Sequence, residues 1–133
     1  MRQRIIIRDL DKPRVEKVED DIKWICESLG FTSGRDIEDT SFKILNEMLE
    51  QFKRNDIVAT EEIAKSLRIE APTVNHHIRN LMETGFVFRE KRKIALRGGS
   101  ISAAIDEMRR DSDKMFERIM EVARKIDEEF DLD

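Results

Sequence analysis

The stretch between residues 60 and 97 constrains the fold more than any other part of the sequence. It contains two short segments whose apolar residues recur every three or four positions, which is the spacing of one face of an amphipathic helix. The second segment opens at Pro72, which suits the first turn of a helix, and it stops at Gly85, a common helix terminator. Because the connection is only three or four residues long, we expect a helix-turn-helix whose first helix is capped by Thr60 and whose second covers residues 72–84.

A β-hairpin is expected directly after the second helix. The composition of "FVFR" (86–89) and "IALR" (94–97) favours strands, and the polar run "EKRK" between them suits a turn. A hairpin appended to a helix-turn-helix is the wing of a winged-helix domain. Five glycines and two prolines in 133 residues leave few helix breakers elsewhere. The sequence therefore predicts a mostly α fold with a small β-wing, and it places the winged helix-turn-helix domain at residues 36–98.

An N-terminal segment, residues 1–35, precedes this domain. "RIIIR" at positions 4–8 is rich in β-branched residues and is expected to form a short edge strand. Apolar residues at helical spacing then predict an amphipathic helix over residues 13–29. After a turn at 32–36, a further helix over residues 36–53 opens the winged-helix domain.

The C-terminal segment, residues 99–133, is expected to form one long helix from residue 100 onward, about 45 Å in length. Its apolar positions follow alternating steps of four and three, a heptad pattern that is interrupted only at Ser112. Since a small domain cannot cover the whole apolar seam of so long a helix, we expect this helix to pair with a second copy of the chain. The alternative is that both terminal helices pack onto the winged-helix core. The residues predicted to form the homodimer interface are Val15, Val18, Ile22, Ile25, Ile105, Met108, Met115, Ile119, Val122 and Ile126.

The net charge of −4 hides an uneven distribution along the chain. Residues 1–59 carry a balance of −2, residues 60–97 of +3 and residues 98–133 of −5. An anionic partner such as nucleic acid would meet the middle segment, with the acidic end turned away from it. No apolar run is long enough for a membrane helix, and the run of three isoleucines near the N-terminus is too short for a signal peptide. We therefore expect a cytoplasmic protein with no membrane partner.

The adjacent histidines His76 and His77 raise the alternative of a metal site. On a helix over residues 72–84, His77 flanks the buried face that contains Val74, whereas His76 points to the opposite side. Neighbouring helical side chains diverge and cannot hold one ion together, since a helical His pair needs a spacing of four residues. The single cysteine, Cys26, excludes an internal disulfide and a cysteine-rich metal cage. We expect no metal and no cofactor, and we expect His77 to be half-buried and hydrogen-bonded.

The exposed face of the second helix carries the side-chain types that read DNA in the major groove. Asn can pair with adenine and Arg with guanine through two hydrogen bonds each, while Thr contacts a thymine methyl or a phosphate. Basic residues of the wing, with Arg97 at its end, would reach the phosphate backbone; the alternative is a turn whose charges serve only solubility. For His76 we favour a DNA contact over a solvated surface side chain. The residues predicted to contact DNA are Pro72, Thr73, Asn75, His76, Arg79, Asn80, Arg89, Lys91, Arg92 and Lys93.

The stretch "APTVNHHIRNLMETGFV" resembles the recognition helix of ArsR-type transcription regulators, with its pattern Pro-Thr-Val-Ser-His-His-Leu, a later Leu and a Gly-Leu-Val exit. The resemblance covers residues 40–98, under half of the chain, and MarR-like and other winged helices share much of it. It implies that Thr73, Asn75, His76 and Arg79 meet bases or nearby phosphates and that the basic wing reaches the flanking backbone. Metal-sensing members carry a Cys-x-Cys pair in the preceding helix, but "TEEIAKSL" has none, and the last helix lacks His and Cys. The resemblance therefore does not extend to metal sensing, whereas the long last helix and the N-terminal extension are similar to archaeal proteins of this fold.

These features favour a sequence-specific, homodimeric DNA-binding transcription regulator whose partner is double-stranded DNA. A winged-helix protein-interaction module is the main alternative, but such a surface would more often expose apolar or aromatic anchors than a basic wing. An RNA- or ribosome-associated winged helix is a third alternative, which the sequence leaves open. No Gly-rich phosphate loop and no nucleophile motif occurs, so an enzyme is not expected.

Overall fold

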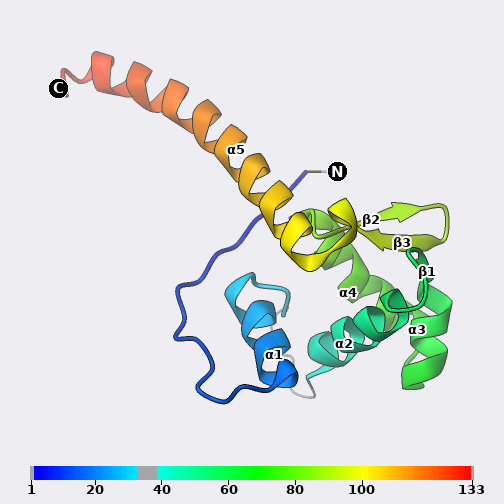
Figure 1. The fold of residues 1–133 in the computed structure, drawn as a ribbon. Coiled ribbons are helices and arrows are strands. Elements are labelled where there is room, and N and C mark those ends of the chain that lie inside the picture. The colour runs from blue at the N-terminus through cyan, green and yellow to red at the C-terminus, as the bar shows by residue number, and fades with distance from the viewer. Residues whose placement is uncertain (1, 33–38, 133) are drawn as a thin grey trace.

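The computed structural model describes residues 2–32 and 39–132 and has the mostly α architecture with a small β-wing that the sequence predicts (Figure 1). The short sheet lies at one edge of the helices, and the last helix extends away from the other elements. The elements are, in chain order, α1 (Val18–Ser28), α2 (Thr40–Phe52), β1 (Val58–Ala59), α3 (Thr60–Leu67), α4 (Ala71–Thr84), β2 (Val87–Glu90), β3 (Lys93–Leu96), the single 3-10 turn η1 (Arg97–Gly99) and α5 (Ile101–Glu129).

The predicted helix-turn-helix is confirmed in α3 and α4, which pack against each other. Pro72 lies in the first turn of α4, and Gly85 ends this helix with a φ of +89°. That left-handed conformation costs little for glycine, and it lets the Gly85 N–H bond to the carbonyl of Met82 at 3.1 Å. The expected cap at Thr60 is wrong. Ala59 is the capping residue because β1 runs directly into α3, so Thr60 is already helical and its side chain is buried.

The wing consists of β2 and β3, which form an antiparallel hairpin. Glu90 pairs with Lys93, so the turn comprises only Lys91 and Arg92 rather than the four residues that the sequence indicates. A third strand, β1, pairs with β3 and gives the sheet the order β1-β3-β2. Periodicity does not reveal β1, because two residues are too short to show any alternation.

The hydrophobic core lies where the helices meet the sheet. Helix α2 packs against α1, α3 and α4, and α4 leads into β2 through Phe86, whose side chain is fully buried. The Phe86 ring lies 4.9 Å from the ring of Phe31, which follows α1. The buried side chains of Met48 in α2, Ile78 in α4 and Ile94 in β3 complete this cluster. Helix α4 and the wing are therefore held in a fixed relation by one shared core.

Helix α1 is shorter than the sequence predicts, because it begins at Val18 rather than near Pro13. Val15 is exposed, so it buries little apolar surface that could stabilise a further helical turn before Val18. The first turn of the observed helix instead contains Glu19 and two aspartates, whose charges complement the positive end of the helix dipole. Apolar spacing alone therefore extends this helix too far toward the N-terminus.

Residues 2–10, which we call the N-terminal segment, are extended but do not form the predicted edge strand. The backbone N–H of Arg4 donates to the carbonyl of Glu83 at 2.9 Å, and that of Arg8 donates to the carbonyl of Ser28 at 2.7 Å. The segment thus crosses the C-terminal ends of α4 and α1 instead of joining the sheet. Most of the turn expected at residues 32–36 lies outside the described residues, as does the domain boundary at residue 36. The helix expected over residues 36–53 is shorter in the structure: α2 begins at Thr40, because Asp39 has a left-handed φ of +53°, and it ends at Phe52.

Helix α5 begins as the sequence predicts. The Ser100 hydroxyl accepts a hydrogen bond from the backbone N–H of Ala103 at 3.1 Å and so caps the helix. Ala104 and Met108 are buried against the winged-helix core, but no residue of α5 after Met108 is buried. Most of this helix therefore projects beyond the domain, as Figure 1 shows.

Candidate nucleic-acid interface

Helix α4 has one buried and one exposed face. Val74, Ile78 and Leu81 are at most 3% exposed and attach the helix to the core. The opposite face reaches solvent and carries hydrogen-bonding groups, as expected for a helix that enters the major groove. On or beside it, Pro72, Thr73, His76 and Arg79 are exposed and Asn75 is half-buried.

The two histidines have different environments, as predicted. His77 is half-buried, and its Nδ1 lies 3.0 Å from the hydroxyl oxygen of Ser41 in α2, so the expected hydrogen bond is confirmed. His76 is exposed, and its ring lies 5.5 Å from that of His77 in an edge-on arrangement. Among residues 2–32 and 39–132, no group of three or more His, Cys, Asp and Glu side chains could hold a metal ion. His77 therefore links α4 to α2, and His76 remains available on the outer face.

The tip of the wing presents several positive charges to solvent. Lys91, Arg92 and Lys93 are exposed, while Arg89 in β2 is half-buried. Within the described ranges, none of these four side chains forms an ion pair, and the same holds for Arg79 on α4. These cations are consequently not neutralised by the protein itself and can interact with phosphates.

Arg97 differs from the other basic residues near the wing: the expectation that it contacts phosphate is wrong, because acidic side chains of α5 already neutralise it. Its guanidinium forms a two-pronged ion pair with Asp111 of α5, with Nη2 3.1 Å from Oδ1, and lies 3.5 Å from Glu107. The hydrogen bond to Asp111 raises the pKa of Arg97, and the same contact lowers the pKa of Asp111. Arg97 therefore connects the end of the wing to α5.

Gln3 extends this connection to the recognition helix, a role that no sequence pattern indicates. Its side-chain amide donates to Asp111 Oδ2 at 2.7 Å and to the backbone carbonyl of Thr84 at 3.1 Å. The N-terminal segment, the last turn of α4 and the proximal part of α5 thus share one hydrogen-bond network. Asn80, a predicted DNA contact, is half-buried on the side of α4 that faces this segment.

The predicted dimer-interface residues fall into two groups. Ile22 and Met108 are buried in the core of the single chain, and Ile25 and Ile105 are partly buried against it. The other group reaches solvent: Val15, Val18, Ile119, Val122 and Ile126 are exposed, and Met115 is half-buried. Intramolecular packing thus accounts for the first group, while the distal part of α5 retains an uncovered apolar seam. Exposed residues beside this seam that the heptad steps do not include are Phe116, Met120, Phe130 and Leu132.

Comparison with known families finds a match, which covers the helix-turn-helix region. Residues 37–87 match a family described as winged helix-turn-helix DNA-binding, a match that extends from α2 into β2. No curated protein and no solved structure matches the chain. The fold is therefore that of a winged helix-turn-helix domain, and the match to a DNA-binding family supports a DNA-binding regulator. Among the described residues, no helix is both long and apolar enough to cross a membrane.

Proposed function

We propose that this chain is a non-enzymatic, sequence-specific transcription regulator that binds double-stranded DNA as a homodimer. The observation that carries the proposal is the set of exposed polar and basic side chains on α4 and at the wing tip, whose cations have no ion-pair partner within the described residues. The matched family is described as DNA-binding, and the resemblance to ArsR-type regulators supports the same class.

Helix α4 would enter the major groove with its N-terminal half toward the bases. Arg79 would pair with a guanine and Asn75 with an adenine, while Thr73 and His76 would contact bases or adjacent phosphates. The N-terminus of α4 adds backbone N–H groups that favour nearby phosphates. The wing would follow the flanking backbone, where contacts supply affinity but little sequence information.

Homodimerisation would come from the distal part of α5, residues 115–129, whereas residues 101–114 form its proximal part. Four exposed apolar side chains, of Phe116, Ile119, Val122 and Ile126, lie along this projecting stretch and are between 51% and 61% exposed. A contiguous exposed apolar surface of this kind is typical of a protein–protein interface. Two paired copies would present two recognition helices related by a two-fold axis, which favours a pseudo-palindromic site.

A selection of bound sequences from a random duplex pool, followed by titration of the selected site, tests this function. We expect one enriched pseudo-palindromic motif and much weaker binding to its scrambled version. RNA duplex of matched sequence is the control, because its narrow, deep major groove does not admit a recognition helix. Equal affinity for all DNA duplexes would contradict sequence-specific binding. Preferential binding of the RNA would contradict the proposal in favour of an RNA-associated role. Absence of nucleic-acid binding would leave the protein-interaction module.

A further inference from the structure

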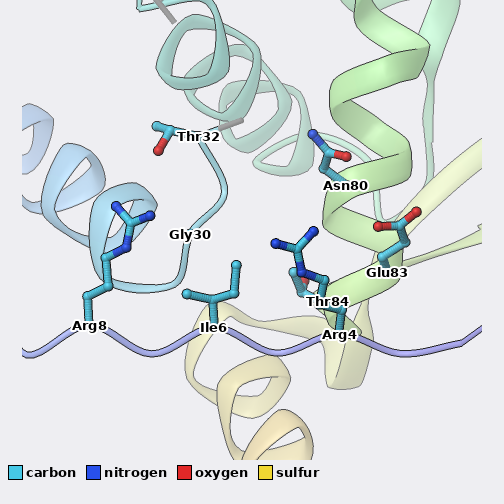
Figure 2. A pocket seen from close by; sticks show the side chains of 8 residues that line it. All are labelled: Arg4, Ile6, Arg8, Gly30, Thr32, Asn80, Glu83 and Thr84. Atoms are coloured by element: carbon cyan, nitrogen blue, oxygen red, sulfur yellow. The ribbon is translucent and has the colours of Figure 1, made fainter. Parts of the chain in front are cut away.

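A pocket of about 210 Å³ lies between the N-terminal segment and the C-terminal half of α4. Figure 2 shows Arg4 extending from the segment toward Asn80 of α4, and Arg8 extending toward Thr32, with Ile6 between the two arginines. The pocket is smaller than the range of about 300–1,000 Å³ that is usual for drug-sized ligands. Its size therefore suits a small molecule.

The N-terminal segment, which forms one wall of the pocket, is held in place by backbone contacts at both ends of that wall. Arg4 and Arg8 are held through the backbone hydrogen bonds to Glu83 and Ser28 described above. Side chains two residues apart in an extended chain lie on the same side, so Ile6 shares the face of the two arginines. Ile6 rests on Gly30, where an added Cβ would lie 2.9 Å from the Ile6 Cβ and where φ is +64°. This close approach requires glycine and brings the segment against the loop after α1.

The electrostatic character of the pocket is set by its two arginines. Within the described parts of the chain, neither the Arg4 nor the Arg8 guanidinium has a hydrogen bond or an ion pair, although Arg97, Arg109 and Arg110 are all paired with carboxylates. One carboxylate, that of Glu83, lines the pocket but lies beyond ion-pair distance of Arg4. Two positive charges against one negative charge favour an anionic ligand.

We propose that this pocket binds a small organic dianion of the dicarboxylate class. A guanidinium binds a carboxylate through two parallel hydrogen bonds, so each arginine provides a complete site for one end of such a ligand. Because Arg4 and Arg8 are four residues apart in an extended chain, their Cα atoms are separated by about 13 Å. Their guanidinium groups can therefore bind the two ends of a short molecule that lies between them. Ile6 supplies an apolar surface under the carbon chain, and Asn80 and Thr32 supply further polar groups.

Calorimetric titration of the full chain with succinate, glutarate and adipate tests the proposal. The ionic strength is kept constant to hold electrostatic screening fixed. We expect one ligand per chain and weaker binding of the monocarboxylate propionate. Arg4→Gln and Arg8→Gln should each weaken binding by about tenfold or more, because each removes a charge-assisted hydrogen-bond pair. Glu83→Gln should strengthen it by removing a like charge.

The matched control is the double variant Lys12→Gln/Arg14→Gln, which removes two charges from the exposed connection between the N-terminal segment and α1. It should leave dicarboxylate affinity unchanged. Equal weakening in this control, no preference for dicarboxylates over propionate, or no binding at millimolar concentrations would each overturn the proposal. Fluorescence of the single tryptophan, Trp24, verifies that the N-terminal segment keeps its position in the arginine variants, since the Trp24 indole N–H donates to the carbonyl of Leu10 at 3.3 Å.

A link between this pocket and DNA rests on the function proposed above, because Asn80 belongs to the recognition helix. If the pocket and the DNA surface are coupled, the dicarboxylate changes DNA affinity by the same factor by which DNA changes dicarboxylate affinity. Calorimetry without DNA tests the pocket alone, so its failure is distinguishable from a failure of DNA binding. If the arginine variants weaken DNA binding and no dicarboxylate binds, the arginines are phosphate contacts and the pocket proposal is wrong.

Discussion

The wing and the proximal part of α5 are both rich in arginine and lysine, but they differ in whether these cations form ion pairs with carboxylates of the protein. At the wing tip, Lys91 and Arg92 of the two-residue turn and Lys93 at the start of β3 have no ion-pair partner within the described chain. In α5, by contrast, Arg109 and Arg110 both pair with Asp106, one helical turn earlier. The number of cations is therefore a poor guide to a nucleic-acid surface, whereas the number of unpaired cations is informative.

The difference follows from local geometry. Residues three or four apart on a helix are neighbours, so an acidic residue at that spacing neutralises an arginine within the same element. The tight turn of a hairpin brings its adjacent side chains to one end of the sheet, where only Glu90 offers an opposite charge in the sequence. Phosphates can neutralise charges exposed in this way, and the distal part of α5 exposes apolar side chains instead. The wing tip consequently suits an anionic partner, whereas the distal part of α5 suits an apolar protein surface.

The largest expected effect concerns the distal part of α5. Replacing both Ile119 and Val122 with glutamate should convert a dimer into a monomer at micromolar concentration, because pairing would bury two unpaired charges. Light scattering coupled to size exclusion measures the mass directly. The double variant Lys114→Ala/Arg124→Ala makes the same change in net charge at polar positions and should remain dimeric. A mass of one chain for the unsubstituted protein would contradict the homodimer.

The next effect concerns the unpaired cations of the wing. Each phosphate that a protein neutralises contributes about −0.9 to the slope of log affinity against log salt. Replacing Lys91, Arg92 and Lys93 with alanine should therefore make this slope shallower by up to about 2–3 units for each wing engaged. Selected and scrambled DNA should change alike, because phosphate contacts carry little sequence information. Fluorescence anisotropy of labelled duplex at several salt concentrations measures the slope.

A triple variant of α5 is the matched control for the wing. Arg109, Arg110 and Lys114 also carry three positive charges, and two of them are already paired with carboxylates. Their replacement with alanine should leave the salt slope unchanged. If the two triple variants lowered the slope equally, the contrast between paired and unpaired cations would be wrong.

A smaller and more specific effect is expected for Arg79 on the exposed face of α4. Arg79→Ala should weaken binding to the selected site by about 1–3 kcal/mol and relax the preference at one base pair. Competition with a set of single-base variants of the site measures this preference. The prediction fails if selected and scrambled DNA lose the same affinity, since Arg79 would then contact only phosphate.

Features that depend on neighbours in the sequence are predictable here, and features that depend on distant partners are not. Gly85 marks the end of α4, and the step from Ser100 into α5 marks a helix start, because both signals lie within a few residues of the structure that they produce. Helical spacing also places His77 correctly beside the buried face. The same spacing cannot say what covers a face, and so Ile22 and Met108 carry a pattern suited to dimerisation although they are buried in the monomer.

The candidate site shows the same division. The exposed position of His76 and Arg79 follows from the helical wheel alone. The ion pair of Arg97 does not follow from the helical wheel, because its partner Asp111 lies 14 residues away on another element. The contact of Gln3 with Asp111 spans 108 residues and depends on the path of the N-terminal segment, which contains no periodic signal. Long-range polar contacts of this kind become visible only in the folded chain.

The smallest expected effect concerns the ion pair that distinguishes Arg97 from the wing cations. Asp111→Asn removes the carboxylate that binds Arg97 and Gln3, and it should lower the free energy of unfolding at pH 7 by roughly 1 kcal/mol, because the pair is partly solvent-exposed. Urea denaturation followed by circular dichroism measures this difference. Asp113→Asn is the control and should have little effect, because Asp113 lies two residues further along α5 at an exposed position without an ion pair among the described residues.

The pH dependence separates the ion pair from a general loss of packing. In the folded chain the pKa of Asp111 is lowered from 3.8, chiefly by the hydrogen bond from Arg97, so the folded state binds a proton there less readily than the unfolded state. The stabilising contribution is therefore complete above the unfolded pKa, and it is lost as the pH falls through the lower pKa of the folded state. The difference in unfolding free energy between the unsubstituted protein and Asp111→Asn should consequently shrink when the pH is lowered below about 4. A difference that stays constant from pH 7 into that acidic range would mean that Asp111 contributes through shape and not through its charge.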